Sequence, residues 1–297
     1  MQAQLATTPQ QRLIFLAYVA PFAVLTLLFG LWPILLSLKV SLTASSSALK
    51  PDAVFVGLAN YRAVFADPLF LQSLKATLIY TAIAVVLNVG FALGYALLLN
   101  SPMIGKGKTF FKIAIFLPVV TPDLAGYVVW RFLYDRSFGA INALATALDL
   151  PLFGGLSSPN TVTLALLIAE LWRHAGFYVI IFLANLALCD KALVEAASLD
   201  GANRWQIFRH VLIPQLRPAI LINGIYALIQ FLKTFTVIVV MTKGGPADLT
   251  NFVSYYAYQL FDQGRYGEAT AMGSVLFACV VAAALAAYAL GNRRPQQ

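Results

Sequence analysis

Apolar residues fill long stretches of this chain, and short polar segments separate them. The long apolar runs lie at about 12–40, 73–100, 109–134, 161–189, 216–241 and 269–291. About 20 helical residues cross a hydrocarbon core of about 30 Å. The runs lack the alternation of β-barrel strands, and a helix satisfies its own backbone groups in lipid. We therefore predict an all-α integral membrane protein with six transmembrane helices in a single domain, 1–297.

The composition agrees with a membrane location. Of the 297 residues, 60% are hydrophobic and 11% are charged, and the mean hydropathy is +0.80. A soluble globule of this size carries more than twice that share of charge. The first run is longer than the core of a secretory signal, so it is expected to remain as the first helix. The two cysteines, Cys189 and Cys279, show no metal-like spacing, and no metal site is expected.

The distribution of Lys and Arg predicts the orientation, because these residues accumulate in cytoplasmic loops. With both termini in the cytoplasm, five basic residues fall in outer loops: Lys50, Arg62, Arg136, Lys243 and Arg265. Ten fall in inner segments: Arg12, Lys106, Lys108, Lys112, Lys191, Arg204, Arg209, Arg217, Arg293 and Arg294. The net charge of +8 therefore indicates contact with anionic membrane lipid, and no nucleic acid partner is expected.

One short motif resembles a nucleotide-binding loop. Gly107-Lys108-Thr109 ends like a P-loop, but Pro102 occupies the position of its first glycine. No strand is expected before it, because the segment connects the second and third apolar runs, so a phosphate cradle has no scaffold. If ATP drives this protein, another subunit must hydrolyse it, and we expect no enzymatic activity in this chain.

A polar, basic segment at 190–218 interrupts the apolar pattern. Glu195-Ala196-Ala197, Asp200-Gly201-Ala202 and Ile213-Pro214 stand at spacings that resemble the "EAA" loop of binding-protein-dependent ABC importer permeases. Further matches resemble the carbohydrate branch, of the maltose and glycerol-phosphate permease type. These are Pro21-Phe22, Trp32-Pro33, 55–61, Leu117-Pro118, 130–134, Gly244-Gly245-Pro246, Thr250 and 266–269.

The resemblance implies a type I ABC importer permease in a bacterial or archaeal cytoplasmic (inner) membrane. It implies a second permease as a heterodimer partner, two ATP-binding cassette ATPase subunits and an extracytoplasmic solute-binding protein. ATP and Mg would bind the ATPase partner, so no cofactor is expected in this chain. The binding protein would rest on the outer loops at 41–72, 134–160 and 242–268. The substrate would be a sugar or sugar derivative, with a neutral sugar as the first expectation.

The segment at 190–218 is predicted to form a helix, a turn and an amphipathic helix. Small residues allow close backbone approach, Asp200-Gly201 favours a turn, and Trp205, Phe208 and Leu212 form an apolar face. Pro214 is expected to end this helix, and Pro218 to begin the next. In the family this is the coupling helix that seats in the ATPase; an amphipathic loop on the membrane surface is the alternative. The coupling residues are Glu195, Ala196, Ala197, Asp200, Gly201, Ala202, Arg204, Phe208 and Pro214.

Polar residues within the spans are candidates for the substrate pathway, because charges are costly there. Glu170, Arg173 and His174 fall at i, i+3 and i+4 in the fourth run, so they are predicted to neutralise one another beside Trp172. An internal ion pair that holds helices together is an equal alternative.

The fifth run carries a polar stripe formed by Asn223, Tyr226, Gln230 and Lys233. Amides and phenols suit sugar hydroxyls, and aromatic rings can stack on sugar faces. Hydrogen bonding between helices would use the same residues. Weaker candidates, more typical of packing or capping, are Asn88, Asp123, Tyr127 and Asn185.

Two other classes of function stay open on the sequence. A membrane-embedded enzyme could use Glu170 and His174 as an acid/base pair, although no nucleophile or metal-spaced histidine cluster accompanies them. An ion-coupled secondary transporter would more often show internal repeats, and none is convincing here.

Overall fold

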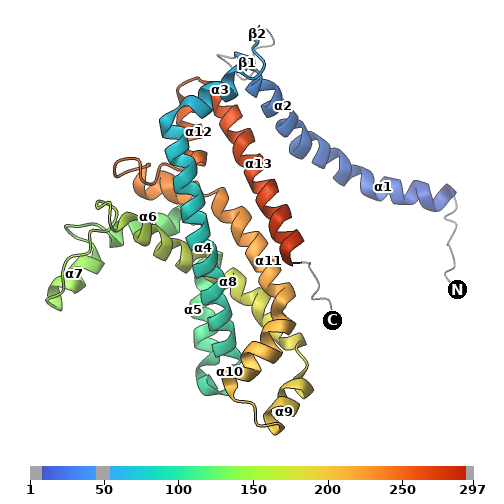
Figure 1. The fold of residues 1–297 in the computed structure, drawn as a ribbon, viewed down its shortest axis with the longest axis vertical. Coiled ribbons are helices and arrows are strands. Elements are labelled where there is room, and N and C mark those ends of the chain that lie inside the picture. The colour runs from blue at the N-terminus through green and yellow to red at the C-terminus, as the bar shows by residue number, and fades with distance from the viewer. Residues whose placement is uncertain (1–8, 45–53, 292–297) are drawn as a thin grey trace. The chain divides into compact units, whose positions relative to one another are not determined.

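The computed structural model describes residues 9–44 and 54–291 and is almost entirely helical over them (Figure 1). Lys50, Arg293 and Arg294, which entered the charge comparison, lie outside the described residues. The chain divides into two compact units. The first comprises residues up to Ala66 together with Gln259–Ser274, and the second comprises Asp67–Tyr258 together with residues from Val275 onward.

The first unit begins with a long apolar helix. It contains α1 (Pro9–Leu25), a π-helical turn (Thr26–Leu31) and α2 (Trp32–Ser41). A two-residue hairpin, β1 (Thr43–Ala44) with β2 (Val54–Phe55), and α3 (Ala59–Ala66) follow. The start of α13 (Tyr266–Gly291) completes the unit. The apolar residues of Leu13–Ser41 are mostly exposed on all sides, as a membrane-spanning helix requires.

Side-chain hydrogen bonds hold the short elements of the first unit together. The Asn60 amide donates to the carbonyls of Ser41 (2.8 Å) and Thr43 (3.0 Å). The hydroxyls of Ser41 and Tyr61 lie 2.8 Å apart. A Cβ on Gly267 would lie 2.6 Å from both Asn60 Nδ2 and the Thr43 carbonyl oxygen, so only glycine fits there. Asn60 lies in the segment 55–61 and Gly267 in 266–269, two of the segments that resemble carbohydrate permeases. These contacts show that both residues have a structural role.

The second unit is built around α4 (Pro68–Asn100), α8 (Val162–Leu188) and α11 (Ile213–Leu232), which pack against one another (Figure 1). Its other elements are a 3-10 turn (Pro102–Gly107), α5 (Lys108–Val120), α6 (Asp123–Leu133), α7 (Ala140–Ala147), α9 (Lys191–Leu199), α10 (Arg204–Ile207), π-helical turns at Phe208–Leu212 and Ile238–Thr242, and α12 (Val253–Asp262), whose last residues belong to the first unit.

Small buried residues on α4 allow this close packing. Ala84, Asn88, Ala92 and Ala96 recur every four positions, and all are buried. Small residues at helix interfaces let membrane helices approach closely. The core extends from this row to Tyr178, Phe182 and other side chains of α8 and α11.

The predicted spans are confirmed in number only if one broken helix counts as a span. Over the described residues, five helices are long and apolar enough to cross a membrane: Leu13–Ser41, Pro68–Asn100, Val162–Leu188, Arg204–Leu232 and Tyr266–Gly291. The run at 109–134 is two helices, α5 and α6, bent by 107°. The prediction of a continuous third helix was therefore wrong. The predicted fifth span, 216–241, is also shifted, because its helix starts earlier and ends at Leu232.

Two π-helical turns directly precede prolines. Thr26–Leu31 ends two residues before Pro33, and Phe208–Leu212 ends two residues before Pro214. A proline ring collides with the carbonyl four residues earlier in a regular α-helix. A locally widened turn relieves this collision, so each helix continues through its proline.

Candidate functional site

The break between α5 and α6 creates polar backbone in the middle of an apolar segment. Thr121 is extended (ψ 134°) between α5 and Pro122, as expected for the residue before a proline. Pro118 and Pro122 also lack N–H donors. The carbonyls that end α5 therefore need partners from elsewhere in the unit.

Arg173 on α8 supplies such a partner. Its Nη1 donates to the Pro118 carbonyl at 3.0 Å, and its guanidinium forms an ion pair with Asp123, the first residue of α6. The Arg173 side chain is 14% exposed and that of Asp123 is 42% exposed. Arg173 thus ties together both sides of the break.

The sequence prediction of mutual neutralisation on α8 was correct only in part. Glu170 pairs with His174, with Oε2 and Nε2 3.1 Å apart. It also accepts a hydrogen bond from the Tyr127 hydroxyl at 2.9 Å. The ion pair that the structure gives Arg173 is with Asp123 and not with Glu170, because the bend brings the start of α6 to α8.

A cavity of 250 Å³ lies at this point. It joins the two predicted polar sets, because residues from α8 and α11 line it together with the ends of α5 and α6. The lining residues are Val119, Asp123, Arg173, His174, Phe177, Tyr178, Tyr226 and Gln230. The rings of Phe177 and Tyr226 are 4.6 Å apart, so the cavity has an aromatic wall beside its amide.

The polar stripe of α11 does not act as one surface. Tyr226 and Gln230 line the cavity, whereas Asn223 is fully buried and donates to the Tyr178 carbonyl at 3.3 Å. Lys233 caps the end of α11 and is exposed. Asn223 therefore links α11 to α8 by a hydrogen bond. Hydrogen bonding between helices was the alternative role given above for the whole stripe.

The remaining candidates have structural surroundings. Trp172 lies outside the cavity, with its ring 5.9 Å from that of Trp130. The amides of Asn88 and Asn185 donate to carbonyls of their own helices, at 3.0 and 2.9 Å. Sequence reasoning ranked Asp123 too low and missed Phe177 and Tyr178. Pro122 directly precedes Asp123, and a proline followed by an acidic residue is a sequence signal for the start of a helix, here α6.

The segment at 190–218 folds as predicted over its first half. Asp190 caps α9 by accepting from the Ala192 N–H at 2.9 Å. Gly201 makes the turn with φ +80°, a conformation that favours glycine. Asn203 and Gln206 then form a reciprocal capping box at the start of α10 (2.7 and 2.9 Å).

The prediction that Pro214 ends the amphipathic helix was wrong. α10, the π-helical turn and α11 form one helix from Arg204 to Leu232, with Pro218 in its interior. The widened turn before Pro214 explains how the helix continues. The second half of the segment at 190–218 is consequently continuous with the helix that carries Tyr226 and Gln230 (Figure 1).

Large apolar side chains of this segment are exposed. Leu199 is 89% exposed and Trp205 is 64% exposed, with the Trp205 ring 5.3 Å from that of Phe208. Ala197, Asp200, Gly201 and Ala202 line a hollow of 340 Å³ together with residues of the following helix. Glu195, Ala196, Arg204 and Pro214 are exposed. Exposed apolar residues beside a hollow are typical of a protein interface.

The connector before α5 has no P-loop architecture. Pro102–Gly107 forms a 3-10 turn and Lys108 begins α5, so no strand precedes the lysine. Among the described residues, no group of three or more His, Cys, Asp or Glu side chains could hold a metal ion.

Comparison with known proteins gives consistent results. The family model described as "Binding-protein-dependent transport system inner membrane component" matches residues 105–296. The trehalose/maltose transport system permease protein MalF of Thermococcus litoralis is 28% identical, over 93% of this chain and 92% of that protein. The sn-glycerol-3-phosphate transport system permease protein UgpA of Agrobacterium fabrum is 31% identical, over 89% of each.

A solved structure shares the fold. The crystal structure of a bacterial alginate ABC transporter, in complex with a periplasmic protein carrying an alginate pentasaccharide, contains a chain that superposes with a TM-score of 0.85. The sequence identity is 22%, and the match covers 96% of both chains.

Proposed function

This chain belongs to the family of inner membrane components of binding-protein-dependent transport systems, and from that premise we propose that it carries a neutral sugar past the broken helix α5–α6. It is a multi-pass permease subunit of an ABC importer and not an enzyme. ATP hydrolysis belongs to a separate subunit of such a transporter.

The cavity beside Arg173 is the observation that carries the substrate proposal. Its ionisable side chains already have partners within the chain: Arg173 pairs with Asp123, and His174 contacts Glu170. The groups left for a ligand are the Gln230 amide, the Tyr226 phenol and the rings around them. Such groups bind hydroxyls and the apolar face of a sugar without a net charge.

The relatives differ in what their names say they transport. MalF is named for trehalose and maltose, and UgpA for sn-glycerol-3-phosphate. The paired state of Arg173 favours the first class for this chain, because a phosphate would have to displace Asp123 or compete with its negative charge.

Coupling to ATP is proposed to run through one helix. The segment from Glu195 to Pro214 would seat in an ATP-binding cassette subunit, and the helix from Arg204 to Leu232 would transmit its motion to the cavity. Tyr226 lies about 33 Å along this helix from Arg204 at 1.5 Å per residue. We further propose a heterodimer with a second permease above two cassette subunits, cytoplasmic termini, and an extracytoplasmic binding protein on the opposite side.

Uptake by the complete transporter tests the substrate proposal. ATP-dependent uptake of labelled trehalose or maltose is measured in membrane vesicles with wild type and Gln230→Ala, with glycerol phosphate as the anionic comparison. Loss of one hydrogen bond is expected to raise the KM for the neutral sugar about fivefold. Preferred uptake of the anion by wild type would contradict the neutral class.

Asn185→Ala is the matched control, because that amide bonds to its own helix and lies outside the cavity. Its uptake is expected to equal that of wild type. If Gln230→Ala behaves like Asn185→Ala, the cavity is not the sugar path.

A further inference from the structure

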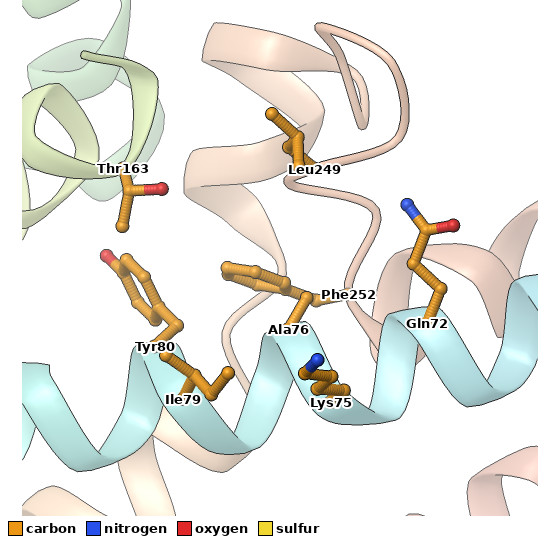
Figure 2. A pocket seen from close by; sticks show the side chains of 8 residues that line it. All are labelled: Gln72, Lys75, Ala76, Ile79, Tyr80, Thr163, Leu249 and Phe252. Carbon is orange, nitrogen blue, oxygen red and sulfur yellow. The ribbon is translucent and has the colours of Figure 1, made fainter. Parts of the chain in front are cut away.

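A second cavity, of 290 Å³, lies in the same unit and shares no lining residue with the first. One face of α4 forms its floor, and Thr163 of α8 and the segment before α12 close it (Figure 2). The lining residues are Gln72, Lys75, Ala76, Ile79, Tyr80, Thr163, Leu249 and Phe252. Nothing in the transport pathway proposed above uses this cavity.

Tyr80, one of the residues that line the cavity, carries a buried hydroxyl without a partner among the described residues. Tyr80 is 2% exposed, and its hydroxyl makes no hydrogen bond within the described chain. Figure 2 shows this hydroxyl directed at Thr163, across the cavity from α4. Burying an unpaired hydroxyl is unfavourable, and this oxygen lies behind the cavity wall with almost no accessible surface, so the part of Tyr80 that a ligand meets is its ring.

The cavity also has one positively charged corner. Lys75 is exposed and is the one formally charged residue among those that line it. Lys75 lies near the start of the apolar run on α4, which begins at about residue 73. A lysine at this depth lies where a span meets the headgroup region.

The remaining surface is apolar and open at the side. Ile79 is 50% exposed and Leu249 is 41% exposed, so the cavity opens onto the surface that α4 presents. The rings of Tyr80 and Phe252 lie 4.8 Å apart and form the inner wall. A small hydrophilic solute would leave these surfaces unfilled, whereas a hydrocarbon chain would cover them.

We propose that this cavity binds one anionic phospholipid. The phosphate contacts Lys75 and Gln72, and an acyl chain covers Ile79, Phe252 and the ring of Tyr80.

Native mass spectrometry of the complete transporter tests this proposal. The detergent-purified complex is titrated separately with phosphatidylglycerol and phosphatidylcholine. Lys75→Gln is expected to weaken the apparent affinity for phosphatidylglycerol about fivefold, from loss of one lysine charge near the lipid phosphate. Lys75→Arg keeps the charge and should retain wild-type affinity. Ile79→Trp should reduce the binding of both lipids by filling the cavity while Lys75 remains.

Lys39→Gln is the matched control, because Lys39 is an exposed lysine in the last turn of α2 and does not line the cavity. It should bind phosphatidylglycerol like wild type. Equal affinity of wild type and Lys75→Gln, or no effect of Ile79→Trp, would overturn the proposal. Full displacement of the lipid by excess inorganic phosphate would also overturn it, since the site would then recognise a free anion.

Discussion

At the scale of single residues, Arg173 contacts both sides of the break between α5 and α6. A helix that breaks within an apolar environment leaves backbone groups without water, and each needs a partner in the protein. Arg173 donates to the Pro118 carbonyl on one side of the break and pairs with Asp123 on the other. It is therefore a positioning residue for α5 and α6 as well as a part of the cavity wall.

Arg173→Gln is expected to destabilise the transporter by about 1–3 kcal/mol, because it leaves Asp123 and the Pro118 carbonyl unpaired. Partial exposure of Asp123 keeps the cost below that of a fully buried pair. The melting temperature of the purified complex measures this. The double variant Arg173→Gln with Asp123→Asn should recover part of the loss. If the stability losses of the Arg173 and Asp123 substitutions simply add, the two side chains do not stabilise each other.

Helical spacing in the sequence was sufficient for local pairs and insufficient for distant ones. Glu170 and His174 are four positions apart, and their contact follows from the helix alone. Arg173 and Asp123 are 50 positions apart. Their contact depends on a bend of 107°, which prolines signal in position but not in angle.

At the scale of elements, the continuity of a helix differs from what the apolar pattern and the prolines predict. The apolar run at 109–134 is broken into α5 and α6, whereas the helix from Arg204 to Leu232 continues through Pro214. The run at 109–134 is apolar on average, so hydropathy averaged over the length of a span could not locate the break after Val120. Pro214 carries the signal of a helix end, yet the widened turn before it keeps the helix intact. The type and approximate location of each span were predictable, but its continuity was not.

Gly267→Ala tests an element junction in the first unit. Its Cβ would collide with Asn60 and the Thr43 carbonyl, so we expect destabilisation of about 1–3 kcal/mol. Gly273→Ala, in the same helix with open space at its Cβ, should be neutral or stabilising. Melting temperatures of the two purified complexes give the comparison. Equal behaviour would show that Gly267 is not at a tight contact.

At the scale of the whole molecule, one helix links the two proposed working parts. The coupling segment begins with α9 and enters the helix that runs from Arg204 to Leu232, whose far half carries Tyr226 and Gln230. In the proposed mechanism, this continuous helix would carry motion at the ATPase to the proposed sugar path without an intermediate contact. The sequence predicts both segments but not their continuity, because a proline at position 214 is typical of a helix end.

Affinity purification of the tagged chain in mild detergent, with mass spectrometry of its partners, tests the central claim most directly. Wild type should recover a second permease and an ATP-binding cassette protein. Gly201→Asp should reduce recovery of the cassette about tenfold or more while retaining the second permease. Gly264→Asp controls for backbone strain, since Gly264 (φ +79°) and Gly201 (φ +80°) share one conformation and both have open space at the Cβ. Recovery of the chain alone, or of undiminished cassette with Gly201→Asp, would contradict the account.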